Sequence, residues 1–451
     1  MDKADNSAQY NKMVNTPVTK LIITLSIPTI LSMLVTNIYN MADTAFVGQL
    51  GTSASGAVGI VFGFMAILQA VGFMFGQGGG SILSRRLGAR DVEGASKIAS
   101  VSFFSAFILS GILAIVSFVG LDTVVMLLGS TETIAPYAKT YISYILLAAP
   151  FLVTSFTMNN ILRYEGKAAL GTVGMMTGAV LNIIGDPIFM FGFKMGIAGA
   201  GLSTALAQLV SFSILLSMFI RHKTETTLSI KLFVNSLDNL GNIMTTGVPS
   251  LLRQALGSLA TVVLNFNAAP YGDSAIAAMS IVSRISFFVF SIALGMGQGF
   301  QPVSAFNYGA RKYKRVRKAF KITLILSLVM MTILSAIAMA FSGDLVKIFR
   351  DDPEVIEIGT RALRLQLMAQ IVIPPCMVTE MLCQSTGRRF AAAMLSSLRS
   401  GLIFIPMLFI MSYLRGLYGL QEAQPLSIVI SAVPALIYAS YFFKSIPTED
   451  E

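Results

Sequence analysis

Charged residues are scarce in this sequence, and tryptophan is absent. Asp, Glu, Lys and Arg make up 12% of the 451 residues. A soluble globular domain carries about 25% charged residues, so this composition excludes an ordinary soluble domain. Apolar residues make up 55% of the chain, and apolar runs of about twenty residues, long enough to cross a bilayer, recur from end to end. We therefore predict an all-α, polytopic membrane protein with the lipid bilayer as its main partner.

Residues that hold metals or catalyse reactions are equally scarce. The single histidine, His222, lies in a polar loop without other candidate ligands. Cys376 and Cys383 lie seven residues apart in one apolar segment, so we interpret them as small apolar residues rather than a disulfide or a metal site. The sequence contains no Ser/His/Asp set and no phosphate loop. We predict that the protein is not an enzyme and that it carries no cofactor.

Twelve apolar segments are long enough to cross a membrane as helices. They are expected at residues 18–46, 54–80, 96–120, 133–162, 168–192, 197–220, 242–268, 274–303, 320–343, 357–384, 391–413 and 423–443. The corresponding domain organisation is an N-terminal segment at 1–17, an N-lobe at 18–220, a linker at 221–241, a C-lobe at 242–443 and a C-terminal tail at 444–451.

Basic residues cluster in alternate loops between these spans. They follow the second span at residues 85–90 and the eighth span at 311–318, whereas the opposite loops hold few basic residues, such as Lys194 and Arg415. This alternation follows the positive-inside rule and predicts that both termini are cytoplasmic, in the cytoplasmic membrane of a prokaryote. The net charge of +10 then reflects topology, and we expect no nucleic-acid partner.

The two halves of the chain repeat at a fixed offset. Pro28 and Pro249 are 221 residues apart, and the same offset relates Gly76-Gln77-Gly78, expected at the end of a span, to Gly297-Gln298-Gly299. Each half holds six spans, so both halves enter the membrane in the same direction. We predict two pseudo-symmetric six-helix lobes related as a parallel repeat, an arrangement used by secondary transporters.

Two carboxylates lie within apolar spans of the first half. Asp186 follows Asn182 by four residues, so the two side chains share a helix face, and Asp43 lies in the first span. Pro187 cannot donate a backbone hydrogen bond and leaves the carbonyl of Ile183 free. Intramembrane carboxylates usually mark an ion or substrate path, and such oxygen groups suit H⁺ or Na⁺. Carboxylates satisfied only by hydroxyl groups, or an ion pair with arginine, remain the structural alternatives.

Polar stripes occur at matching positions of the first and seventh spans. Asn37, Asn40 and Thr44 correspond at the 221-residue offset to Ser258, Thr261 and Asn265. Spacings of three and four place each stripe on one helix face. We interpret the stripes as the walls of a substrate cavity, with hydrogen bonding between helices as the alternative.

A third intramembrane acid, Glu380, lies at the repeat position of Asn159 in the second half. It could receive a cationic substrate, pair with Arg253 or Arg284, or serve as a second protonation site. The sequence does not rank these three roles.

With these features the sequence resembles the multidrug and toxic compound extrusion (MATE) family, in the branch typified by DinF and MepA. The resemblance rests on twelve spans in two halves, Asp43, and the series Asn182, Asp186-Pro187 and Thr204. It implies a cation site at Asp43, Asn182, Asp186 and Thr204. The assigned substrate-binding residues are Asn37, Tyr39, Asn40, Asn159, Ser258, Thr261, Asn265 and Glu380.

The resulting prediction is a monomeric antiporter that exports small organic, mostly cationic compounds in exchange for H⁺ or Na⁺, by alternating access of two lobes. A lipid-linked precursor flippase of the same superfamily is an alternative, although such proteins often have fourteen helices and a cationic cavity. A channel is a second alternative, distinguished by currents far above carrier turnover.

Overall fold

The computed structural model describes residues 3–450, and their regular secondary structure is entirely helical. Eleven helices are long and apolar enough to span a membrane, and a bent pair of shorter helices brings the number to twelve if that pair is one span. The predicted all-α, polytopic fold is confirmed.

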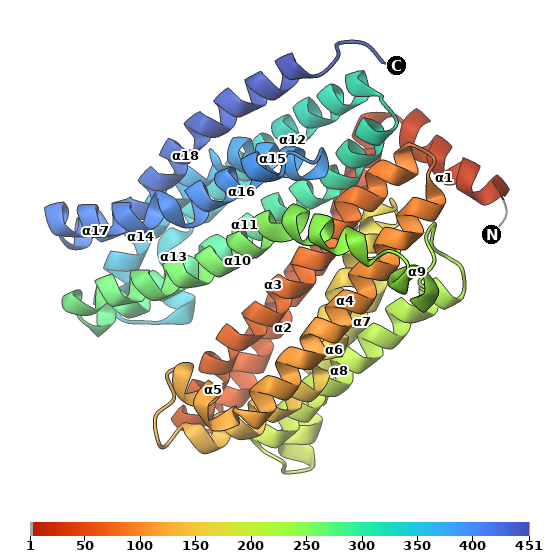
Figure 1. Cartoon of the computed structure of the whole chain (residues 1–451). Coiled ribbons are helices and arrows are strands. Elements are labelled where there is room, and N and C mark those ends of the chain that lie inside the picture. Colours follow the sequence, from red (N-terminus) through yellow and green to blue (C-terminus); the bar gives the residue numbers. More distant parts are fainter. Residues whose placement is uncertain (1–2, 451) are drawn as a thin grey trace. The chain divides into compact units, whose positions relative to one another are not determined.

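The chain divides into two compact units (Figure 1). The first unit holds the chain up to Asn15 together with Leu31–Leu251, and the second holds Thr16–Ile30 and the chain from Leu252 onward. Helices α2 (Val18–Gly48) and α10 (Leu240–Ala268) therefore each contribute one part to each unit.

The other helices of the first unit precede α10 in the sequence. They are α1 (Lys3–Asn15), α3 (Thr52–Gly88), α4 (Val92–Val119), α5 (Leu121–Leu127), α6 (Ala135–Tyr164), α7 (Ala168–Pro187), the π-helix η1 (Ile188–Gly192), α8 (Ile197–Ile220), α9 (Ile230–Val234) and η2 (Leu237–Asn239). Helix α6 packs against α3, α4 and α8, and α7 packs against α8.

The other helices of the second unit follow α10. They are η3 (Ala269–Tyr271), α11 (Asp273–Gly309), α12 (Tyr313–Ala340), α13 (Ser342–Phe349), α14 (Pro353–Gln370), α15 (Ile373–Ser385), α16 (Arg389–Ser397), the π-helix η4 (Leu398–Leu402), α17 (Phe404–Arg415) and α18 (Leu417–Ser445). Helix α11 packs against α12, α14 and α15, and α18 packs against α14, α15 and α17.

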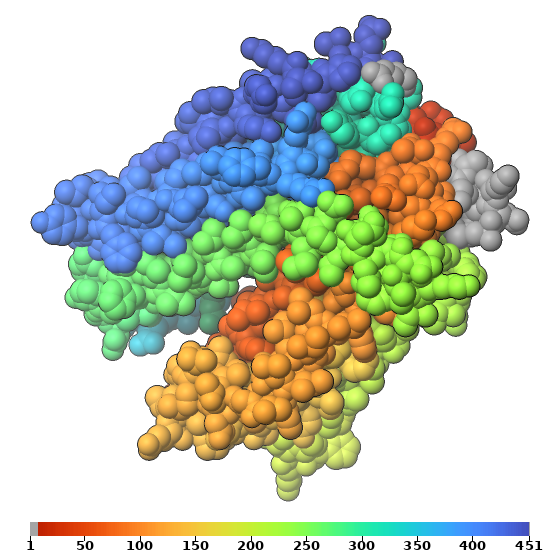
Figure 2. All heavy atoms as spheres, in the orientation of Figure 1, coloured from red at the N-terminus to blue at the C-terminus, as the bar shows by residue number. Residues whose placement is uncertain are grey.

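Large apolar side chains are exposed on the outer helices of the second unit. Tyr413 and Leu414 on α17, and Ile437 and Tyr441 on α18, are each more than 60% exposed. These helices lie on the blue face of Figure 2. Apolar exposure on this scale is expected of a surface that faces lipid tails rather than water.

The tenth predicted span is broken rather than continuous. Residues 357–384 were expected to form one helix, but α14 and α15 meet at an angle of 49°. The break precedes Pro374 and Pro375, which lack the backbone N–H groups needed to continue the helical hydrogen bonds of the preceding turn. The break places the start of α15, and with it Glu380, on a separate axis from α14.

Close backbone contacts repeat with the 221-residue offset. Gly78 packs against α10, where an added Cβ would lie 2.3 Å from the carbonyl oxygen of Ile243 and 2.9 Å from Cα of Gly247. Its repeat partner Gly299 packs against α2, where a Cβ would lie 2.6 Å from Cα of Ser26. Both glycines lie inside long helices, α3 and α11, and not at helix ends as the sequence suggested. The sequence repeat therefore corresponds to a repeated helix contact, and glycine is needed at both positions because the two backbones lie so close together.

The substitution Gly78→Ala is expected to destabilise the protein by about 1–3 kcal/mol, because the added methyl group would overlap backbone that cannot rotate away. The measurement is the thermal-unfolding midpoint in detergent. Gly111→Ala is the matched control, because Gly111 lies in the middle of α4 and an added Cβ would meet nothing within 4 Å. Equal midpoints for the two variants would contradict the close contact.

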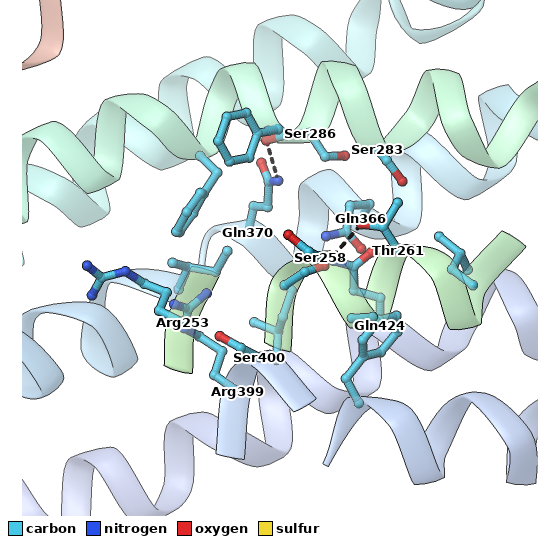
Figure 3. Close-up of a pocket in the computed structure, with 18 of the residues that line it drawn as sticks. Arg253, Ser258, Thr261, Ser283, Ser286, Gln366, Gln370, Arg399, Ser400 and Gln424 are labelled. Carbon is cyan, nitrogen blue, oxygen red and sulfur yellow. Dashed lines mark hydrogen bonds between the residues drawn. The ribbon is translucent and has the colours of Figure 1, made fainter. Parts of the chain in front are cut away.

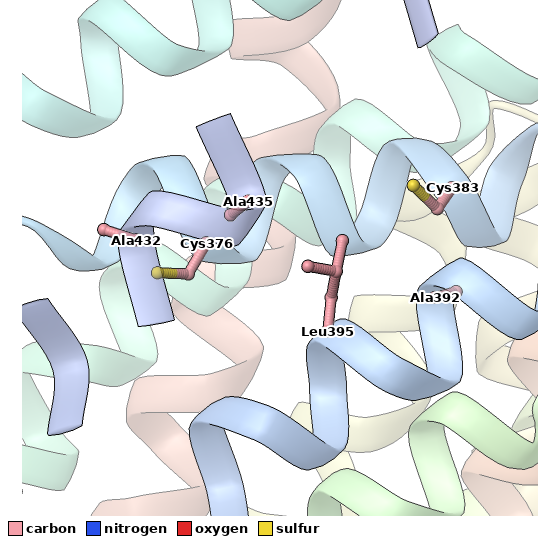
Figure 4. Packing of buried hydrophobic residues seen from close by; sticks show 6 residues of the cluster. All are labelled: Cys376, Cys383, Ala392, Leu395, Ala432 and Ala435. Carbon is pink, nitrogen blue, oxygen red and sulfur yellow. The ribbon is translucent and has the colours of Figure 1, made fainter. Parts of the chain in front are cut away.

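The two cysteines are free and buried on α15. They belong to an apolar cluster with Leu395 and the alanines Ala392, Ala432 and Ala435 (Figure 4). Their interpretation as small apolar packing residues is confirmed.

The side chain of Glu165 binds the segment that follows α8 through hydrogen bonds. This side chain is 0% exposed and accepts hydrogen bonds from the backbone N–H groups of Glu225 (2.9 Å) and Thr226 (3.0 Å) and from the Thr226 hydroxyl. Lys167 pairs with Glu225 at 2.6 Å. Two residues between α6 and α7 thus hold the start of the predicted linker against the first unit.

We expect this attachment to weaken as the pH rises. Burial raises the pKa of the Glu165 carboxyl from its ordinary 4.5 to about 7, against the Thr226 hydrogen bonds and the Lys167 charge, which lower it. Below about pH 4.5 the group is protonated both free and attached, so it opposes attachment least there. The attachment then becomes weaker as the pH rises from 4.5 through about 7, because the Glu165 carboxyl ionises at a lower pH when the segment is detached than when it is attached.

The measurement is hydrogen exchange at the Thr226 amide, which should accelerate with pH more steeply in the wild type than in Glu165→Gln. Glutamine keeps an acceptor oxygen but does not ionise. The same pH dependence in both proteins would contradict this role of Glu165.

Candidate functional site

The first unit brings the two predicted acids of the first half together. Asp43 on α2 is 2% exposed, and Asp186, in the last turn of α7, is 0% exposed. Their carboxyl groups lie close enough to interact directly. Two negative charges at this separation in a buried site repel strongly, and a bound proton or cation removes that repulsion.

The other two predicted cation ligands complete the same cluster. Nδ2 of Asn182 donates to Oδ1 of Asp186 at 3.3 Å and to Oγ1 of Thr204 at 3.1 Å. Asn182 and Thr204 are each 2% exposed. The i, i+4 spacing on α7 therefore places Asn182 beside Asp186, and α8 supplies Thr204.

Tyr141 on α6 belongs to this cluster, although sequence reasoning missed it. Its hydroxyl donates to Oδ2 of Asp43 at 3.2 Å, and it also interacts with Thr204. The side chain is 0% exposed. Nothing in the surrounding apolar segment marks this tyrosine, and only the packing of α6 beside α8 shows its position.

Several buried oxygen atoms of the cluster lack a donor. Within the described part of the chain, Oδ1 of Asp43, Oδ2 of Asp186 and Oδ1 of Asn182 have no hydrogen-bond partner. Buried polar atoms are normally satisfied, and carboxylate and amide oxygens are ligands for H⁺ or Na⁺. This donor set fits a small cation.

The backbone after Asp186 is irregular. Pro187 ends α7, and the chain continues as the π-helix η1. Proline cannot donate the N–H that an α-helix needs at this turn. Short π-helical segments frequently occur at functional sites.

The second unit contains a cavity of about 360 Å³ (Figure 3). Ser258 and Thr261 of the predicted polar stripe line it, whereas Asn265 is not among its lining residues. Further polar side chains come from α11, α14, η4 and α18. The residues that Figure 3 labels are Arg253, Ser258, Thr261, Ser283, Ser286, Gln366, Gln370, Arg399, Ser400 and Gln424.

Glu380 does not line this cavity. It is 0% exposed on α15, with Oε1 2.6 Å from Nη1 of Arg253 and Oε2 3.6 Å from Nη2 of Arg399. Of the three roles considered for Glu380, the structure therefore shows pairing with Arg253, while Arg284 is exposed. Arg399, which sequence reasoning did not consider, is its second partner.

The remaining predicted substrate residues lie in the first unit. Tyr39 lines a cavity of about 10 Å³, the size of one water molecule, bounded by α2, α6, α7 and α8. Asn37, Asn40 and Asn159 are not among its lining residues. Nδ2 of Asn37 and Oδ1 of Asn40 are buried and have no hydrogen-bond partner within the described residues.

Comparison with known proteins agrees with the resemblance. The MatE family model matches residues 28–188 and 249–410, so its two matches begin 221 residues apart, at Pro28 and Pro249. The multidrug export protein MepA of Staphylococcus saprophyticus is 28% identical over 413 residues, covering 91% of each chain. MepA of Staphylococcus aureus strain MSSA476 is 29% identical over 423 residues, covering 93% of each.

A solved structure shows the same fold. It is the outward-facing conformation of a multidrug resistance MATE family transporter of the MOP superfamily, with a TM-score of 0.91 and 26% identity. The match covers 96% of this chain and 98% of that chain. Because the family model spans most of both halves, this chain belongs to the MatE family, a family of multi-pass membrane transporters.

Proposed function

We propose that this chain is a multidrug efflux antiporter that exports small amphipathic organic compounds, mostly cationic, in exchange for H⁺ or Na⁺. The observation that carries the proposal is the buried cluster in which Asp43 and Asp186 meet Asn182, Thr204 and Tyr141. Cation coupling requires carboxylates within the membrane that can bind a cation and release it again.

The organic substrate class is supported by the relatives. MepA proteins that match over nine-tenths of this chain are named multidrug export proteins. The described residues provide at most twelve spans, which disfavours the fourteen-helix flippase alternative. The proposed location is the cytoplasmic membrane of a prokaryote, with both termini cytoplasmic.

The driving force is sufficient for export. Each net positive charge that enters across 100 mV releases about 2.3 kcal/mol, so the membrane potential contributes when more positive charge enters than leaves with the substrate. A pH difference of one unit adds about 1.4 kcal/mol for each proton. Release of the cation on the cytoplasmic side would return the acid cluster to a state in which substrate can bind again, by alternating access.

The test is efflux of a cationic dye from proteoliposomes under an imposed pH gradient and, separately, an imposed Na⁺ gradient. At least one gradient should accelerate efflux above that of protein-free liposomes, and collapsing that gradient with an ionophore should remove the acceleration. Efflux that neither gradient changes would contradict the proposal.

A further inference from the structure

We propose that the cavity of the second unit binds the anionic group, such as a carboxylate, of an amphipathic compound, with Arg399 as the principal contact. The inference rests on the proposed function only in treating the ligand as a transported compound. It concerns the cavity rather than the acid cluster, and a ligand group that is negatively charged rather than a cation.

The charge of the cavity wall favours an anion. Arg253 and Arg399 are the charged side chains among the described lining residues, and that lining includes neither Asp nor Glu. Glu380 is not among the lining residues, and its carboxylate is shared between both guanidinium groups. Two positive charges against one negative charge leave one excess positive charge at the cavity. A cationic group in the cavity would meet two guanidinium groups before it met the carboxylate.

Arg399 retains hydrogen-bonding capacity. Its side chain is 11% exposed, and its Nε and Nη2 atoms, which are buried, have no hydrogen-bond acceptor within the described chain. The contact from Nη2 to Glu380 is an ion pair at 3.6 Å, longer than a hydrogen bond. The planar edge of a guanidinium group binds a carboxylate through two parallel hydrogen bonds, which is the strongest pairing available to arginine.

The backbone that carries Arg399 is itself unusual. Arg399 lies in the π-helix η4, and Asp186 of the first unit lies two residues before the π-helix η1. Each half of the chain thus has a π-helical segment close to a charged side chain, which is buried for Asp186 and largely buried for Arg399. Because π-helical turns cost stability and are frequent at functional sites, this recurrence supports a role for Arg399 beyond packing.

The rest of the cavity suits the remainder of an amphipathic molecule. Gln370 donates through Nε2 to the carbonyl of Ser286 at 2.9 Å, which leaves Oε1 of Gln370 and Oγ of Ser286 buried without partners in the described chain. Phe287 and Phe290 supply apolar surface, and the Phe290 ring lies 5.2 Å from Cζ of Arg399. A volume of about 360 Å³ falls at the lower end of the range of small-molecule sites.

The experiment compares two fluorescent probes that differ in one group, a carboxylate-bearing rhodamine and its methyl ester. Their affinities for the purified full-length protein in detergent are measured by fluorescence polarisation. The wild type should bind the acid about tenfold more tightly than the ester, the ratio expected when a charged hydrogen bond is made to only one of them.

Arg399→Gln should remove most of this preference by weakening binding of the acid about tenfold, while the affinity for the ester changes less than twofold. Arg284→Gln is the matched control, because Arg284 is an exposed arginine of the same unit and does not line the cavity. Glu380 keeps its 2.6 Å partner Arg253 in the Arg399 variant, so the fold should persist.

Three outcomes would overturn the inference: equal or tighter binding of the ester by the wild type, an unchanged acid preference in Arg399→Gln, or an equal loss for both probes. The measurement is made at equilibrium and needs no gradient. Failure here would therefore leave cation-driven efflux intact, and failure of cation coupling would leave the acid-to-ester ratio unchanged.

Discussion

Asp186→Asn is expected to abolish cation-driven efflux while leaving the protein folded. Asparagine has nearly the same shape as aspartate and can still accept the hydrogen bond from Asn182. It cannot exchange a proton or neutralise Na⁺, so the cluster would keep only the charge of Asp43. We expect driven efflux to fall by more than about tenfold, because even a change beside a metal ligand typically costs that much in affinity.

Stability should change in the opposite direction from transport. Removing one of two neighbouring buried carboxylates relieves their repulsion, so the unfolding midpoint of Asp186→Asn should equal or exceed that of the wild type. Asp122→Asn is the matched control, because the Asp122 side chain is 81% exposed and pairs with Lys139. Efflux at the wild-type rate in Asp186→Asn, at matched expression, would exclude a coupling role for this acid.

Glu380→Gln is expected to cause the largest loss of stability in the second unit. It leaves the guanidinium groups of Arg253 and Arg399 close together and without their shared carboxylate. Breaking a buried ion pair by removing one partner typically costs about 3–5 kcal/mol, since the remaining charge stays desolvated. The measurement is urea or thermal unfolding in detergent.

An exposed ion pair supplies the control for Glu380. Glu449 pairs with Lys314, and both side chains are more than half exposed. Glu449→Gln should therefore change stability by less than about 1 kcal/mol. If Glu380→Gln were as mild as Glu449→Gln, the two arginines would have to be satisfied by other groups, and the charge assigned to the cavity would be wrong.

The sequence predicted the fold and the acid cluster because membrane burial restricts what a chain can contain. A carboxylate is costly within an apolar span, so Asp43 and Asp186 stood out against their surroundings. The i, i+4 relation of Asn182 and Asp186 needs only helical geometry, and the structure shows their hydrogen bond. The repeat was visible because Gly78 and Gly299 are fixed by backbone contact rather than by side-chain chemistry.

What the sequence could not predict depends on packing between distant helices. Tyr141 is one of several tyrosines in apolar segments, and only the folded arrangement places its hydroxyl at Asp43. Arg399 lay within a span that was expected to be an ordinary helix, whereas it lies in the π-helix η4 and pairs with Glu380 at 3.6 Å. Local propensity specifies neither feature.

The most direct test of the central claim is reciprocal coupling at the acid cluster. If substrate and cation are exchanged, an outwardly directed gradient of a cationic dye imposed on proteoliposomes must drive inward movement of H⁺ or Na⁺, followed by an internal pH indicator or radioactive sodium. We predict dye-driven cation entry in the wild type and in Asp122→Asn, and none above protein-free liposomes in Asp43→Asn or Asp186→Asn. Dye-driven cation entry that persists in both acid variants would contradict the account.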